Sequence, residues 1–373
     1  MLFIGDSLTF QLYESWRARL RNERYAKGAD AGNAWCNGRC EGAVPDLCSG
    51  HCAVKSNDYA QHSSHYSVCD NGATLMMAEG FRWVLSSESF TASDPRVARC
   101  ARRIRNHPGD FGLEVIPHAH VAQMIAAAWR HTPVPPHGER LPVRRVAVVY
   151  NQMAHIHLFI RLVKECYASG NGMSEAAATS AAVRDVFRYW ADDQARWAQL
   201  LANLTTGSAA PRGSVGEQRG DAAADARERQ LPGPTAVYLR TSPPAADAFC
   251  VKPSGAPQEP IEPGALVHGV MTGHGEYSHQ YVYWINDMMR AAFRAHGHGV
   301  VDHEAMLGAR VDAYPCSQNG EGDKLHFCLP GPPDWALDSL VRQVTAGTRG
   351  GVSGGGGAGG GGGGRRAGIP IRR

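Results

Sequence analysis

The stretch Leu2-Phe3-Ile4-Gly5-Asp6-Ser7-Leu8 decides the fold class of this chain. It is a short apolar run that ends in Gly-Asp-Ser, and apolar residues then recur at four-residue spacing through Leu12, Trp16 and Leu20. A short buried strand that passes directly into a helix with one apolar face is the first half of a parallel β-α unit.

The same pattern returns three times along the chain. Apolar runs at 146–150, 236–239 and 300–301 end at Asn151, Arg240 and Asp302. Amphipathic helices are predicted over 176–202, 280–295 and 335–344, whereas residues 26–80 are predicted to be rich in loops. The inward faces of the first two helices are predicted to carry Val183, Val186, Phe187, Trp190, Trp197, Leu200 and Leu201, and Val282, Ile285, Met289 and Phe293. The alternation predicts an α/β fold with a parallel sheet covered by helices on both faces.

In such sheets the ligand site lies at the carboxyl ends of the strands. Four polar residues are predicted to meet there: Ser7, Asn151, Arg240 and Asp302. The sequence therefore points to one cleft at this edge.

Ser7 is the candidate nucleophile. Gly5 permits a tight turn and close substrate approach. A serine that opens a helix also lies among unpaired backbone N–H groups, which can stabilise an oxyanion. The alternative is that Ser7 is a structural helix N-cap, which is the commoner use of serine at this position.

Asp323 and His326 are candidates for the rest of a catalytic triad. A serine hydroxyl needs a base, and the base needs a carboxylate that orients it. Asp and His three residues apart can meet that need, although Asp-x-x-His also arises by chance in a chain with 17 histidines.

Five blocks of sequence resemble the trichome birefringence-like, or PC-esterase, family of the SGNH (GDSL) hydrolase superfamily. Residues 323–335, D-K-L-H-F-C-L-P-G-P-P-D-W, resemble the family's C-terminal D-C-x-H-W-C-L-P-G-x-P-D-x-W. The other four blocks are similar to its motifs and stand in the same order: 3–8, 149–152, 240–243 and 306–315.

The resemblance implies a three-layer α/β/α fold with Ser7 as nucleophile, His326 as general base and Asp323 as its orienting carboxylate. It implies that Asn151 donates to the oxyanion together with the Ser7 backbone N–H, and Gly72 is the candidate for the other donor. The implied activity is transfer of O-acetyl groups between an acetyl donor and a polysaccharide acceptor in the Golgi or secretory pathway, without a cofactor or metal. A carbohydrate acetylesterase and an inactive glycan-binding module are the alternatives.

The chain departs from the family motifs at several positions. Lys324 replaces the family's cysteine, so Cys328 is expected to pair with Cys316 or Cys100 instead. Met153-Ala154 replaces a Gly-His pair, and His155 and His157 in the strand-like stretch that follows are expected to face opposite ways.

The loop-rich segment holds Cys36, Cys40, Cys48 and Cys52 near His51, His62 and His65. A zinc site and free thiols are alternatives, but the C-x3-C spacing is unusual for zinc knuckles, so disulfides are favoured. Ten cysteines and the sequon at Asn203 favour the secretory route.

One domain is predicted over 1–345, with a disordered insertion at 207–233 and a disordered glycine-rich tail at 346–373. No apolar run is long enough to span a bilayer, and a net charge of +3 argues against a nucleic-acid partner. Met1 lies directly against the first strand, so we expect that an upstream targeting segment is missing from this chain.

Arg240 has two interpretations. It is either a structural arginine paired with a carboxylate such as Asp302 or Asp312, or an arginine that faces the substrate.

Overall fold

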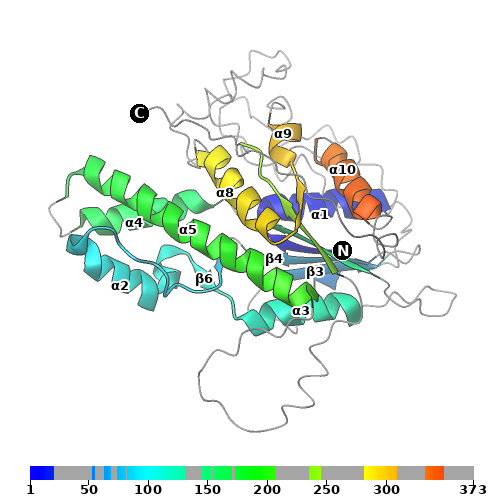
Figure 1. Cartoon of the computed structure of the whole chain (residues 1–373), viewed down its shortest axis with the longest axis horizontal. Coiled ribbons are helices and arrows are strands. Elements are labelled where there is room, and N and C mark those ends of the chain that lie inside the picture. Colours follow the sequence, from blue (N-terminus) through cyan, green and yellow to red (C-terminus); the bar gives the residue numbers. More distant parts are fainter. Residues whose placement is uncertain are drawn as a thin grey trace, which may run out of the picture.

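The computed structural model describes residues 1–20, 53–54, 63–68, 74–80, 82–130, 145–152, 155–169, 173–206, 235–244, 281–308 and 332–347. These residues form an α/β fold around a seven-stranded sheet (Figure 1). The insertion predicted at 207–233 and most of the tail predicted at 346–373 lie outside the described residues.

The sheet has the strand order β2-β3-β4-β1-β7-β8-β9. Its strands are β1 (Leu2–Gly5), β2 (Ala53–Val54), β3 (Ser63–Val68), β4 (Thr74–Glu79), β7 (Val146–Asn151), β8 (Thr235–Arg240) and β9 (Gly299–Val301). The five strands β4, β1, β7, β8 and β9 are parallel, and β3 runs antiparallel to its neighbours β2 and β4. The predicted parallel sheet is therefore confirmed.

Helices and short elements complete the described chain. They are α1 (Ser7–Leu20), β5 (Trp83–Val84), η2 (Pro95–Val97), α2 (Ala98–Asn106), η3 (Pro108–Phe111), β6 (Glu114–Val115), α3 (His118–Arg130), α4 (Ile156–Ala168), α5 (Glu175–Thr206), α8 (Val282–Ala295), α9 (His303–Leu307) and α10 (Pro332–Gly347). No helix among the described residues is both long and apolar enough to cross a membrane.

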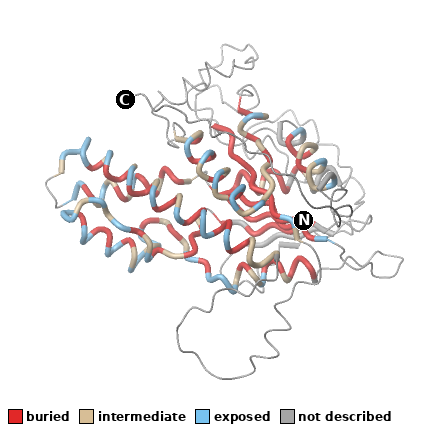
Figure 2. The backbone as a smooth tube through the Cα atoms, viewed as in Figure 1, coloured by how far each residue is buried: buried red, intermediate tan, exposed pale blue. Residues whose placement is uncertain are grey.

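Alternate residues of the central strands face two different helical layers. Ile4 and Tyr150 belong to a large core cluster with residues of α3, α5 and α8, whereas Phe3 and Val149 belong to a smaller cluster with residues of α1 and α10. Both faces of the strands are consequently buried, which Figure 2 shows as a continuous band through the middle of the molecule. This two-sided burial explains why the strands read as continuous apolar runs.

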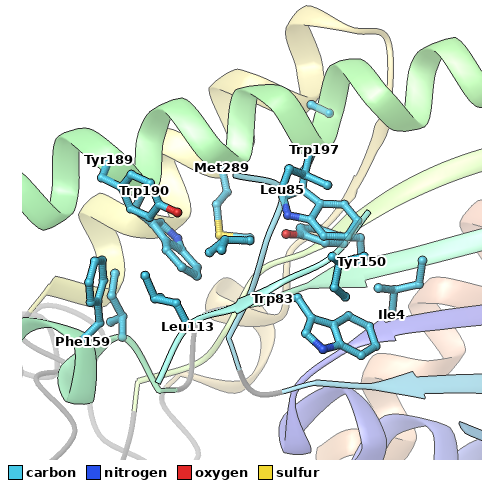
Figure 3. Packing of buried hydrophobic residues seen from close by; sticks show 14 of the residues in the cluster. Ile4, Trp83, Leu85, Leu113, Tyr150, Phe159, Tyr189, Trp190, Trp197 and Met289 are labelled. Carbon is cyan, nitrogen blue, oxygen red and sulfur yellow. The ribbon is translucent and has the colours of Figure 1, made fainter. Parts of the chain in front are cut away.

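The predicted inward faces of the two central helices are confirmed. Trp190 and Trp197 of α5 are buried, and so are all four residues named for α8. Figure 3 shows Trp197 of α5 above Tyr150, whereas Tyr189 and Trp190, nearer the start of the helix, lie toward Phe159 and Leu113. The Trp197 and Tyr150 ring centroids lie 4.9 Å apart.

One sequence prediction about local structure is wrong, and another omitted a strand. The segment 26–80, predicted to be rich in loops, also contains β4, whose Met76 is the register partner of Leu2 in β1. The stretch around His155 and His157 is not a strand, since it begins α4, and the two rings lie 5.9 Å apart. Apolar runs of three or four residues carry no period that separates a helix from a strand.

The first part of α5 extends beyond the sheet. Trp197 packs on Tyr150 near the carboxyl end of β7, so the start of this 32-residue helix reaches past the strand ends. There α5 lies against α4 (Figure 1). A disulfide between Cys100 and Cys166 joins α4 to α2. We call α2, η3, α4 and the first part of α5 the helical lobe.

Candidate functional site

Ser7 lies where the sequence predicts it, at the turn from β1 into α1. It is the first residue of the helix and is buried, with 8% of its surface exposed. The capping group is Asp6, whose carboxylate accepts hydrogen bonds from the backbone N–H groups of Leu8 at 3.1 Å and Thr9 at 3.4 Å. The interpretation of Ser7 as the N-cap is therefore wrong, because Asp6 fills that role.

Gly5 allows β1 and β7 to approach where the two strands end. It is the register partner of Asn151, and a Cβ atom at this position would overlap the Asn151 carbonyl oxygen and the Thr9 side chain. The absence of a side chain at position 5 therefore brings Ser7 and Asn151 to the same edge of the sheet.

Asn151 is fully buried, and both ends of its amide are bonded. Its Oδ1 accepts hydrogen bonds from Arg240 Nη2 at 3.0 Å and from Ser242 Oγ at 3.1 Å. Its Nδ2 donates to the Arg240 carbonyl oxygen at 2.6 Å. Because two donors bind the same end of the amide, that end is the oxygen and the other end is the nitrogen. Nδ2 carries two hydrogens and uses one of them for the Arg240 carbonyl, so the second can bind another acceptor.

Arg240 is also buried, and its Nη2 reaches three groups around the start of α1. Besides Asn151, Nη2 donates to Thr9 Oγ1 at 3.2 Å and lies 3.8 Å from Asp6 Oδ1. Burial, opposed by Asp6, lowers the pKa of the Arg240 guanidinium to about 10. These contacts fit the structural interpretation, with Asp6 as the carboxylate.

The partners named for Arg240 from the sequence are not the ones observed. Asp302 accepts hydrogen bonds from Arg290 Nη2 at 2.7 Å and from Thr241 Oγ1 at 3.0 Å. Asp312 lies outside the described residues. The pairing of Arg240 with Asp302 was therefore a wrong prediction.

A second layer of polar residues holds the end of β8. The Asn286 amide accepts from the Ser242 N–H at 3.0 Å and donates to the Ser242 carbonyl at 2.8 Å. It also donates to Glu304, which lies 3.2 Å from Arg290. Sequence reasoning missed Asn286, although an asparagine on the inner face of an otherwise apolar helix is a detectable signal.

His303 lines a small cavity between α1 and α9. The residues around the cavity are Leu8, Gln11, Leu12, Arg240, Pro243, His303 and Leu307. Burial, reinforced by the nearby Arg240 charge, holds the pKa of His303 well below its usual range. His303 itself is buried.

The remaining site residues lie outside the described residues: Gly72, Asp323 and His326. Their convergence on Ser7 stays a prediction. What the structure brings together at one edge is Gly5, Ser7, Asn151 and Arg240, joined through Asp6 and Thr9.

The described residues bear on the predicted cysteine pairings but do not include the cysteine-rich segment considered for zinc. Within the described ranges, no three His, Cys, Asp or Glu side chains are grouped so that they could hold a metal. The four cysteines of 36–52 lie outside those ranges, as does Cys328. Cys100 is bonded to Cys166, so the alternative that pairs it with Cys328 is wrong, and the pairing of Cys328 with Cys316 stays a prediction.

Comparisons of the chain with protein-family models, with curated proteins and with solved structures gave no match.

Proposed function

We propose that this protein is a polysaccharide O-acetyltransferase with an SGNH-like site that works through an acetyl-serine intermediate. The observation that carries the proposal is the position of Ser7. It opens a helix directly after a central parallel strand, the capping role is filled by Asp6, and Asn151 lies on the neighbouring strand. The five sequence blocks that resemble the PC-esterase family support the same assignment.

The reaction is a double displacement. His326, oriented by Asp323, takes the proton of the Ser7 hydroxyl while the oxygen attacks the carbonyl carbon of an acetyl ester. The tetrahedral intermediate collapses, the alcohol of the donor leaves with the proton from His326, and acetyl-Ser7 remains. A sugar hydroxyl then attacks the acetyl group by the reverse sequence and regenerates the serine.

Asn151 and the Ser7 backbone N–H are the proposed oxyanion donors. The hydrogen bonds from Arg240 and Ser242 hold the Asn151 oxygen, so its nitrogen presents a preset N–H. A preset donor stabilises developing charge without reorganisation during the reaction. In this mechanism Arg240 is a positioning residue for Asn151.

Hydrolysis uses the same intermediate, with water as the acceptor in place of a sugar hydroxyl. The sequence resemblance favours transfer. The Cys100–Cys166 disulfide supports an oxidising compartment, as expected for the Golgi or secretory pathway.

Labelling with a fluorophosphonate probe tests the proposal. The wild-type chain should become covalently labelled at Ser7, and Ser7→Ala should abolish labelling. Ser339→Ala, in a partly buried helical serine of α10, is the matched control and should label like wild type. An unlabelled but folded wild-type protein would instead indicate an inactive glycan-binding module.

Mass spectrometry with an acetylated donor then separates the two reactions. A transferase passes the acetyl group from Ser7 to an added oligosaccharide, whereas an esterase releases acetate at the same rate with or without that acceptor.

A further inference from the structure

Arg82 is a partly buried cation that forms no ion pair within the part of the chain that the structure describes. Its Nε and Nη1 atoms are shielded from solvent, and neither has a hydrogen-bond partner among the described residues. Guanidinium N–H groups in folded proteins are nearly always bonded, so two orphaned donors on one side chain need an explanation.

The residues around Arg82 further destabilise its unpaired positive charge. Burial and the positive charge of Arg161 on α4 both lower the pKa of Arg82. The Glu114 carboxylate, from the strand paired with β5, accepts a hydrogen bond from the Trp83 indole at 2.8 Å and forms no ion pair with Arg82 within the described chain. Gly112, with φ of 67°, packs its backbone against the Arg82 guanidinium, where any side chain would overlap it.

An anion would remove the penalty of this arrangement. A guanidinium presents a planar fork that matches the two oxygens of a carboxylate, or two oxygens of a phosphate.

Arg82 lies close in the chain to the proposed acyl site. The backbone N–H of Gly80, two residues before it, donates to the Gly5 carbonyl at 2.8 Å. Gln152, which follows Asn151, donates to the Gly80 carbonyl at 3.2 Å. The segment that carries Arg82 therefore leaves the sheet beside Gly5 and enters the helical lobe.

The helical lobe is itself cationic. Residues 94–110 contain five arginines and two aspartates. Arg99 and Arg102 are exposed on α2 and have no ion pair among the described residues. A surface of one sign attracts a polyanion over several ångströms before any direct contact forms.

We propose that Arg82 is an oxyanion subsite that binds the carboxylate of an acidic sugar in the acceptor polysaccharide. The inference rests on the proposed function for the identity of the ligand, but the oxyanion chemistry stands on the Arg82 environment alone. The same fork would take a phosphate group of an acyl donor, so the test must separate the two.

The experiment is calorimetric titration of the full chain carrying Ser7→Ala, which prevents turnover. The ligands are a uronate trisaccharide, the same trisaccharide with its carboxyl groups reduced to alcohols, and inorganic phosphate. Each is titrated into this protein and into versions that add Arg82→Gln, Arg82→Lys or Arg294→Gln. Arg294 is an exposed arginine of α8 and serves as the matched control.

We expect the uronate to bind at least about tenfold more weakly after Arg82→Gln, because a charge-assisted pair is lost. The uronate affinity of the Arg82→Lys version should lie between those of the parent chain and the Arg82→Gln version. The Arg294→Gln version should bind the uronate as tightly as the parent chain. The reduced trisaccharide should bind weakly and should not respond to Arg82→Gln.

Two results would overturn the proposal. One is uronate affinity that is unchanged by Arg82→Gln, or lost equally with Arg294→Gln, which indicates diffuse charge attraction. The other is Arg82-dependent binding of phosphate without binding of the uronate, which assigns the fork to a phosphorylated donor. Absence of fluorophosphonate labelling at Ser7 in the wild-type chain would count against the proposed function but not against the oxyanion subsite.

Discussion

At the scale of single residues, the candidate site depends on buried polar side chains that hold one another. Asp6, Asn151 and Arg240 come from three segments far apart in the sequence, and each is at most 2% exposed. The strand patterns predicted that Asn151 and Arg240 would share an edge with Ser7. They could not predict that Asp6 would be the partner of Arg240, because an aspartate within one turn of a helix start is equally satisfied by capping alone.

Asn151→Ala should slow turnover by roughly a hundredfold or more, as loss of an oxyanion donor does. It should also lower the free energy of unfolding by about 1–3 kcal/mol, because the Nη2 group of Arg240 loses its closest acceptor. Steady-state kinetics and urea unfolding measure the two effects.

Ser242→Ala is the matched control for Asn151. It removes one donor from the Asn151 oxygen but leaves the amide N–H groups and Arg240 in place. Turnover should fall only a few-fold, with about 1 kcal/mol lost in stability. Equal losses of activity in the two variants would exclude a direct role for the Asn151 N–H.

At the scale of elements, α5 connects the sheet to the helical lobe. Near the sheet its Trp197 packs on Tyr150, whereas nearer its start the Asp185 carboxylate accepts hydrogen bonds from Ser93 Oγ at 3.1 Å and Tyr167 at 3.0 Å. The periodicity of 176–202 predicted the helix and its buried face. It could not show that half of that face covers a lobe rather than the sheet, since both partners are apolar.

Removing the Cys100–Cys166 disulfide should loosen the lobe before the sheet. The double change Cys100→Ala with Cys166→Ala should cost about 2–4 kcal/mol in the free energy of unfolding, because the bond closes a loop across 66 residues of sequence. Amide hydrogen exchange should accelerate in α2 and α4 and change little in β1 and β7.

The single variant Cys166→Ala under reducing conditions is the control, because it changes the packing of one side chain where no disulfide is present. If the double variant accelerates amide exchange in the sheet strands as much as in α2 and α4, the lobe and the sheet unfold as one unit, and the expected independence of the lobe is wrong.

At the scale of the whole molecule, two apolar layers enclose the sheet, and the larger one contains a buried acid. Asp193 of α5 is completely buried, and its Oδ1 accepts from the Leu85 N–H at 2.9 Å. Burial raises the pKa of this carboxyl from 3.8 to about 7. Asp193 links α5 to the segment that carries Arg82 from the sheet to the lobe.

The sign of the resulting pH dependence follows from linkage. Below pH 4 both the folded and the unfolded chain hold the Asp193 proton. Between pH 4 and pH 7 the unfolded chain releases it while the folded chain keeps it, so this carboxyl progressively lowers the stability of the fold. The loss reaches roughly 4 kcal/mol above pH 7.

Asp193→Asn should remove this contribution, because an amide can accept the Leu85 hydrogen bond without a charge. The variant should gain stability relative to wild type as the pH rises from 4 to 8, measured by urea unfolding at each pH. Asp192→Asn, in the exposed neighbour on α5, is the control and should follow the wild-type profile. A difference between Asp193→Asn and wild type that stays constant with pH would refute the assignment.

The sequence by itself determined the elements whose side chains repeat with a clear period or form an unbroken apolar run. The start of α1, the strands β7 and β8, and the inner faces of α5 and α8 lie within a few residues of the predictions. These features depend on local geometry, because the spacing of apolar residues along one segment decides which face is buried.

Tertiary structure alone decided which segments became neighbours. The chain between residues 26 and 80 carries no strong period, and β4 becomes a strand because it pairs between β1 and β3. Cys100 pairs with Cys166 because α2 and α4 pack together, and Arg240 meets Asp6 because β8 lies two strands from β1. Such contacts join residues far apart in sequence, and their free energy depends on how the whole chain packs rather than on any one segment.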